Sequence, residues 1–123
     1  MGARPTLDII ANLAIQGDWE ALAAISEASF SIAVCDYARE HGWLVHYQRQ
    51  SGHVGKDGTW RGSGPKGFPD LVLARAGRVL MPELKAEKGV LSPEQKRWGK
   101  ELGASVWDCW RPRDSGRILK ELE

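Results

Sequence analysis

The chain has 123 residues, 27% of them charged, and a formal net charge of +1, a size that fits one domain. No segment approaches the roughly 20 consecutive apolar residues that cross a bilayer, and the first six residues lack the order of a secretory signal, so we expect a soluble, cytoplasmic protein without a membrane partner. Cys35 and Cys109 lack the spacing of a zinc site or a disulfide framework, which predicts two buried free thiols.

The small net charge conceals an uneven distribution along the chain. Residues 1–48 contain two basic and six acidic side chains, whereas residues 49–120 contain fifteen basic and eight acidic ones. The middle and C-terminal part is therefore a basic protein, and a nucleic-acid partner is compatible with this composition.

The N-terminal part is expected to be helical. Apolar residues recur with helical periodicity over 7–15 and 19–25, and Gly17-Asp18 between them supply a helix stop and an N-cap. A third helix is predicted from Ser26 to about His41. One face of that helix carries Glu27, Phe30, Val34 and Ala38. A carboxylate thus falls on an apolar stripe.

Strands are predicted in the middle of the chain. Residues 43–48 form the first candidate, and residues 51–68, with six glycines and several basic side chains, are expected to form a mobile surface loop. Residues 70–75 and 78–85 form a β-hairpin around Ala76-Gly77. Pro82 cannot donate to a strand ladder, so a bulge or strand break is expected just before Glu83.

The C-terminal part begins with a strong helix signal. Ser92 is the predicted N-cap, Pro93 the first helical residue and Gln95 the partner in a capping box, and Gly103 ends the helix. A strand is predicted over 105–110 and a closing helix over 114–122, capped by Asp114.

The hairpin carries the residues that indicate chemistry. Asp70 begins one strand, while Glu83 and Lys85 end the other and point to one face because they are two residues apart. Strand pairing then brings two carboxylates and an amine together. Two convergent carboxylates favour a hard cation such as Mg²⁺ or Mn²⁺ between them, and Lys85 could orient a water or neutralise charge on a phosphate. This set suits hydrolysis of a phosphodiester.

The sequence resembles the VRR-NUC branch of the PD-(D/E)xK nuclease superfamily over about residues 26–122. The strings that carry the resemblance are Gly67-Phe68-Pro69-Asp70-Leu71, Glu83-Leu84-Lys85, Gly89, Leu91-Ser92 and Gln95, with Ser26-Glu27 before them and Trp110-Arg111-Pro112 and Asp114 after them. The resemblance implies an α/β, restriction-endonuclease-like αβββαβ core with a mixed central sheet flanked by helices. Residues 26–123 would form this nuclease domain, and residues 1–25 a short helical extension.

The resemblance also implies the roles of individual residues. Asp70, Glu83 and the backbone carbonyl of Leu84 would bind Mg²⁺ or Mn²⁺, with Glu27 near the metal directly or through water. Lys85 would be the catalytic lysine, and Gln95 would reach the site from the following helix. Phosphate contacts are expected from seven basic residues: Arg49, Lys56, Arg61, Lys66, Lys88, Lys96 and Arg97.

The expected function is a structure-specific DNA endonuclease. Stand-alone members of the resembled family are similar to Holliday-junction resolvases, which implies branched DNA as substrate, a homodimer, and a bacterial or phage-infected cell as its setting. A non-catalytic DNA-binding or assembly module with the same fold is the main alternative, and an enzyme acting on RNA or a nucleotide is another.

Several of these residues also have ordinary structural interpretations. Glu27 could be a helix N-terminal carboxylate favoured by the dipole, and Gln95 could act only in the capping box or serve both roles. Trp98, Trp107 and Trp110 are expected in a core or interface, while Trp60 is the candidate for stacking on a base.

Overall fold

The structure is a computed structural model that describes residues 4–48, 52–54, 56–62 and 65–123. It is a mixed α/β protein with helices and small sheets. The helices are α1 (Leu7–Ile15), α2 (Trp19–Ala23), α3 (Glu27–Glu40), α4 (Pro93–Leu102) and α5 (Ser115–Leu122), the last preceded by a 3₁₀ turn (Pro112–Asp114). The strands are β1 (Leu44–Tyr47), β2 (Gly52–Val54), β3 (Trp60–Gly62), β4 (Leu71–Arg75), β5 (Arg78–Leu80), β6 (Glu83–Leu84) and β7 (Cys109–Trp110).

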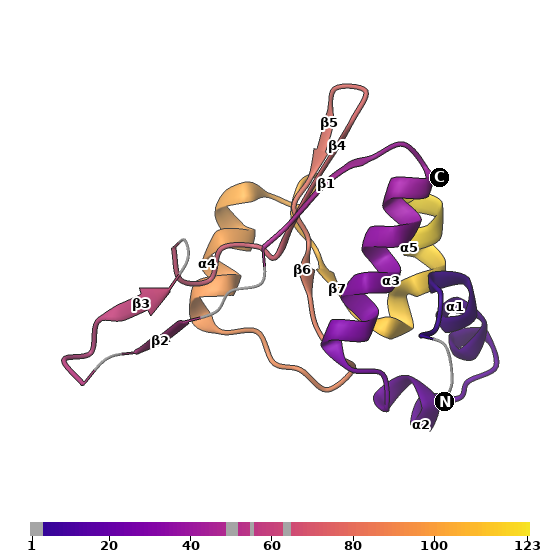
Figure 1. The fold of residues 1–123 in the computed structure, drawn as a ribbon, viewed down its shortest axis with the longest axis horizontal. Helices are drawn as coiled ribbons and strands as arrows, with labels where there is room; N and C mark the ends of the chain where they lie inside the picture. Colours follow the sequence, from indigo (N-terminus) through magenta and orange to yellow (C-terminus); the bar gives the residue numbers. More distant parts are fainter. Residues whose placement is uncertain (1–3, 49–51, 55, 63–64) are drawn as a thin grey trace.

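The central sheet has the order β1-β4-β5, and both of its pairings are antiparallel. Helices α1, α3 and α5 lie on one side of it, and α4 lies on the other (Figure 1). Leu71 and Leu73 of β4 are fully buried and pack in one core with Phe30 and Val34 of α3 and Ile118 of α5. The alternation along β4 therefore selects the face of the sheet that the helices cover.

The N-terminal helices belong to the same hydrophobic core. Leu7 and Ile10 of α1 and Leu22 of α2 are buried in it, and α1 packs against α5 and the 3₁₀ turn. Thr6 and Asp18 cap the two helices through their side chains, as the sequence pattern predicts for Asp18. None of the helices in the described ranges is both long enough and apolar enough to span a bilayer.

Several sequence predictions are confirmed by the local geometry. The β4–β5 hairpin turns at Ala76-Gly77, and both residues have positive φ. The strand breaks before Glu83, since β5 ends at Leu80 and β6 begins only after Pro82. The capping box at Ser92 and Gln95 is complete. Cys35 is a buried free thiol, whereas Cys109 is only half-buried.

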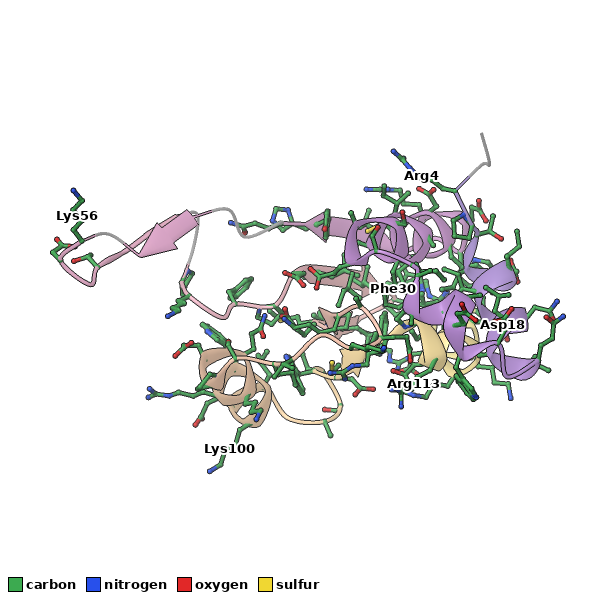
Figure 2. The ribbon with its side chains drawn as sticks, turned by 90° about the horizontal axis from the view of Figure 1, so that it is seen from below. Arg4, Asp18, Phe30, Lys56, Lys100 and Arg113 are labelled. Atoms are coloured by element: carbon green, nitrogen blue, oxygen red, sulfur yellow. The ribbon has the colours of Figure 1, made fainter. Side chains whose placement is uncertain are left out.

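Two predictions for the strands are wrong. The segment 51–68 is not simply a loop, because β2 and β3 within it form an antiparallel pair (Figure 1). Lys56 lies at the far end of this arm, distant from Phe30 in the core (Figure 2). The strand predicted over 105–110 is reduced to Cys109–Trp110, because its parallel partner β6 has only two residues after the break at Pro82.

Candidate functional site

The structure brings Asp70 and Glu83 together from two different sheets. Asp70 immediately precedes β4, and its backbone carbonyl accepts a hydrogen bond of 2.8 Å from the amide of Gln48. Glu83 begins β6, where its amide donates to the carbonyl of Asp108 over 2.8 Å. The amide of Leu84 donates to Asp70 Oδ2 over 3.3 Å, which fixes the aspartate against β6. The predicted convergence of the two carboxylates is therefore present in the fold.

Glu83 is the most unusual polar residue of the site. Its side chain is only 1% exposed, and Oε1 accepts a hydrogen bond of 2.6 Å from Nε2 of Gln95. Oε2 is also buried, and it has no hydrogen-bond donor when both Glu83 and Asp70 are ionised. A buried acceptor without a partner costs free energy, so its retention suggests a ligand that interacts with this oxygen.

The electrostatics of the pair follow from its burial. Desolvation, the charge of Asp70 and a hydrogen bond between the two carboxyl groups raise the pKa of Glu83 to about 9. Desolvation also raises the pKa of Asp70, while its hydrogen bonds with Glu83 and Leu84 and the charge of Lys85 oppose that rise. Without a cation, the two carboxyls therefore share a proton at neutral pH.

Gln95 connects helix α4 to the acidic pair. Its Oε1 accepts a hydrogen bond of 2.8 Å from the amide of Ser92 and completes the capping box, while its Nε2 donates to Glu83. The oxygen of the Gln95 side-chain amide thus stabilises the helix terminus, and its nitrogen contacts the site. Gln95 therefore completes the capping box and also contacts Glu83, while its catalytic role stays a prediction.

Lys85 and Glu27 act on the site with unequal strength. The Lys85 charge lowers the pKa of both Asp70 and Glu83, and its backbone is held by a 3.0 Å hydrogen bond from its amide to the carbonyl of Trp110. Glu27 is the weakest of the groups that raise the pKa of Glu83. Phe30, Val34 and Ala38 on the predicted apolar face are buried, whereas Glu27 at the start of α3 is exposed.

The predicted phosphate contacts are exposed where the structure describes them. Lys56, Lys66, Lys88, Lys96 and Arg97 all have exposed side chains. Lys66 lies 3.7 Å from Glu94, so part of its charge is already compensated. Arg49 lies outside the described residues. Trp60 and Arg61 belong to β3, but their side chains lie outside the described part of the structure.

The acidic pair has the donor chemistry of a small hard cation. Within the described ranges, no three His, Cys, Asp or Glu side chains gather closely enough to hold a metal by themselves. Mg²⁺, however, commonly takes one or two carboxylates and completes its shell with water. Asp70, the unpartnered oxygen of Glu83 and the Leu84 carbonyl would supply such a partial shell, so these residues fit the group.

Sequence reasoning missed the residues that hold the loop between β6 and α4. Arg111 donates to the carbonyl of Gly89 over 2.7 Å, and the buried carboxylate of Glu87 accepts from the amide and the Nε of Arg113 over 2.7 and 2.9 Å. These bonds tie the segment after Lys85 to the C-terminal region. The sequence motif Trp110-Arg111-Pro112 could have pointed to the role of Arg111, but no sequence pattern pointed to Glu87.

Gly67 sets the distance between the Asp70 loop and α4. Its φ is +84°, and a Cβ at this position would lie 2.5 Å from Glu94 Cβ and 2.8 Å from the Gln95 amide nitrogen. Only glycine therefore allows the loop to contact the first turn of the helix. This contact fixes Gln95 relative to the acidic pair.

Gly67→Ala is expected to lower the free energy of unfolding by about 2 to 4 kcal/mol, because the new methyl group meets backbone and adds to the cost of a positive φ. Urea denaturation measures this change. Gly77→Ala is the matched control, since Gly77 has a φ of +80° and no atom within 4 Å of the added Cβ. Equal losses in the two variants would contradict the close contact between Gly67 and α4.

The site therefore combines the buried carboxyl of Glu83, the half-buried carboxyl of Asp70, a nearby ammonium and an amide that orients one carboxylate. This combination can bind a divalent cation beside a phosphate and position a water. No protein-family model, curated protein or solved structure matches the chain in any of the three comparisons, so its function has to be argued from this geometry.

Proposed function

We propose that the chain is a Mg²⁺- or Mn²⁺-dependent nuclease that hydrolyses phosphodiester bonds in branched or otherwise structured DNA. The observation that carries the proposal is the buried Oε2 of Glu83, which has no hydrogen-bond donor when Glu83 and Asp70 are both ionised, with Gln95 holding the other oxygen. Such an arrangement costs stability in the free protein and is repaid by a bound cation.

The proposed core is the restriction-endonuclease-like αβββαβ unit of the VRR-NUC branch, formed by residues 26–123 with residues 1–25 as an extension. Its support is the chain order of α3, the sheet strands β1, β4 and β5, helix α4 and strand β7. The expected mixed central sheet is absent from the described residues, since β1, β4 and β5 pair only antiparallel and the parallel pair of β6 and β7 is a separate two-stranded sheet.

Asp70, Glu83 and the Leu84 carbonyl would hold the cation. When bound, a Mg²⁺ or Mn²⁺ ion offsets negative charge on the phosphate and lowers the pKa of a water molecule. Glu83 must give up its shared proton to take part, and Gln95 then keeps Oε1 in place by its 2.6 Å hydrogen bond. Asp70 is held by the amide of Leu84, so both carboxylates have little freedom to turn away.

Lys85 would act on the reacting phosphate. It lies two residues after Glu83, and its charge already acts on both carboxyls. A compact ammonium at this place can orient the attacking water or offset charge that develops on the phosphate oxygens. Glu27, exposed at the start of α3, is the proposed residue for contacts through water.

DNA would be held through its backbone by the exposed basic residues, without reading sequence. Paired cuts in a four-way junction require two centres, so a homodimer acting like a Holliday-junction resolvase is part of the proposal. Its proposed setting is the cytoplasm of a bacterium or a phage-infected host.

A panel of labelled substrates tests this function. The wild-type chain is expected to cleave nicked, flapped or four-way DNA in Mg²⁺ or Mn²⁺ and to leave the same DNA intact in a chelator, because the charge of the phosphate then has no counterion at the carboxylates. RNA duplexes of matched sequence distinguish a ribonuclease. Metal-independent binding without any cleavage would instead favour a non-catalytic DNA-binding module.

A further inference from the structure

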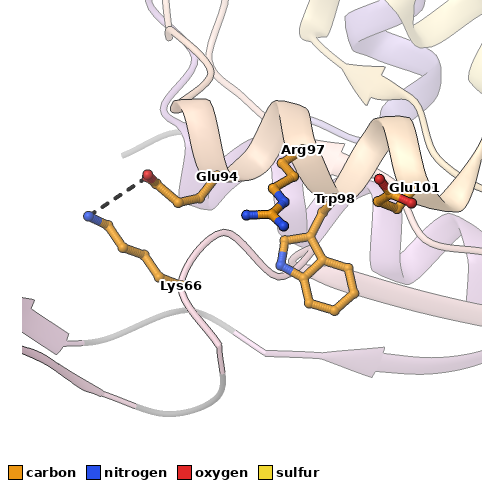
Figure 3. Close-up of a pocket in the computed structure, with 5 residues that line it drawn as sticks. All are labelled: Lys66, Glu94, Arg97, Trp98 and Glu101. Atoms are coloured by element: carbon orange, nitrogen blue, oxygen red, sulfur yellow. Dashed lines mark ion pairs between the residues drawn. The ribbon is translucent and has the colours of Figure 1, made fainter.

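A second feature of helix α4 lies next to Gln95 and involves other side chains. A cavity of about 340 Å³ opens between α4 and the loop that leads to Asp70. Its lining residues are Lys66, Glu94, Arg97, Trp98 and Glu101, whose side chains surround the open space in Figure 3. None of the contacts that hold the acidic pair uses these side chains, so the cavity is a separate feature beside the site.

The composition of the cavity is unusual for a phosphate site. The cavity is lined by two cations, Lys66 and Arg97, and by two carboxylates, Glu94 and Glu101. The charges of these four side chains cancel. A phosphate would meet two carboxylates there. A nucleobase, by contrast, is neutral, has donors and acceptors at its edge, and presents a flat face that stacks on an indole.

Trp98 provides the flat surface. Its ring is half-buried, and Phe68 packs edge-on against it with ring centroids 5.0 Å apart and an interplanar angle of 83°. This contact fixes the indole in position, so stacking on it would cost little ordering. Because the sequence pattern placed Trp98 in a core or interface, its open face at a cavity is a finding of the structure.

The cavity is coupled to the acidic pair by short connections. Phe68 is two residues before Asp70, and Trp98 is three residues after Gln95, which contacts Glu83. The close approach of Gly67 to Glu94 keeps the loop and the helix at a fixed separation. A group bound on Trp98 would therefore be held at a set distance from the reacting centre.

We propose that this cavity binds one unpaired nucleobase of the DNA strand that is cut at the Asp70–Glu83 centre. Trp98 stacks on the base. Arg97, which the sequence assigns to a phosphate contact, bonds here instead to the polar edge of the base, together with Glu101. The inference rests on the proposed nuclease function and adds to it a substrate class, which is DNA with an unpaired nucleotide next to the cleavage point. A paired base cannot enter, because both faces of it are occupied within the duplex.

Binding is measured by fluorescence anisotropy in a chelator, so that the result does not depend on cleavage. The probes are a duplex with one unpaired nucleotide and a fully paired duplex of equal length. Wild-type protein is expected to prefer the first, and Trp98→Leu to lose about tenfold or more of its affinity for it, the range of one stacked base. Trp19→Leu, which removes a 60% exposed tryptophan on α2, is the matched control and is expected to bind as wild type. Equal affinity of wild type and Trp98→Leu would overturn the proposal.

Two further measurements keep the test decisive if Trp98→Leu folds poorly. 2-Aminopurine at the unpaired position is expected to lose fluorescence on binding to wild-type protein, and unchanged fluorescence would contradict stacking. Glu101→Gln is expected to weaken the preference about threefold. Unchanged or tighter binding would show that the cavity does not hold a base edge. Tighter binding is the result expected if the cavity holds a phosphate, because the change removes a negative charge.

The same variants separate the two proposals. Cleavage that persists unchanged in Trp98→Leu would remove the base site and leave the nuclease in place. A preference for the unpaired nucleotide that depends on Trp98, in a protein that cuts none of the DNA substrates, would remove the nuclease and leave a binding site for an unpaired base.

Discussion

Asp70→Asn and Glu83→Gln are each expected to reduce Mg²⁺-dependent DNA cleavage by about a thousandfold, while the metal-free protein stays as stable as wild type or becomes more stable. The loss follows because each change removes an anionic oxygen donor from the proposed cation site. The gain follows because the ionised Glu83 Oε2 is buried beside the Asp70 carboxylate without a hydrogen-bond donor. A neutral amide at position 83 can donate to Asp70, which is worth about 1 to 3 kcal/mol.

Initial cleavage rates on one labelled branched substrate measure the first effect, and urea denaturation in a chelator measures the second. Lys85→Met serves as the contrasting variant. It is expected to lose cleavage to a similar extent and yet keep its stabilisation by Mg²⁺, because it removes a charge that acts on the phosphate and leaves both carboxylates in place. Full cleavage by purified Glu83→Gln protein would contradict the assignment of the site.

The stability of the metal-free protein is expected to fall as the pH rises from about 5 to 9. The pKa of Glu83 is raised from an ordinary value of 4.5 to about 9 in the fold. Below pH 4.5 the carboxyl is protonated in both the folded and the unfolded chain, so its contribution to stability is fully present. Above that pH only the folded chain keeps the proton, and stability is lost until the pH passes about 9. The slope is at most about 1.4 kcal/mol per pH unit for one group.

Melting temperatures in a chelator and in Mg²⁺ across this pH range measure the effect. Mg²⁺ is expected to stabilise the protein most at high pH, because it competes with the shared proton for the same oxygens. Glu83→Gln is expected to flatten the profile and to remove the Mg²⁺ effect, whereas Glu101→Gln, an exposed change on α4, is expected to keep both. A wild-type profile without slope would contradict the raised pKa of Glu83. A Mg²⁺ effect that persists in Glu83→Gln would show that Glu83 does not hold the cation.

Local signals in the sequence were sufficient wherever a few neighbouring residues control the backbone. Gly77 permits the positive φ that the β4–β5 turn requires, and the side chains of Ser92 and Gln95 satisfy the first amides of α4. Pro82 ends β5 because it lacks an amide proton. The same reasoning missed the pairing of β2 with β3, because six glycines in that segment hid the strand pattern.

The candidate site shows a similar division. The sequence alone predicted the candidate residues Asp70, Glu83, Lys85 and Gln95, because the spacing of Glu83 and Lys85 and the capping box at Gln95 are local properties. Only the tertiary structure decided that Glu83 is 1% exposed, that Gln95 reaches it, and that Glu27 stays at the surface. Only the packing of α4 against the loop at Gly67 opened a cavity in front of Trp98. Burial, a raised pKa and a cavity depend on groups far apart in the chain, and no pattern within one segment encodes them.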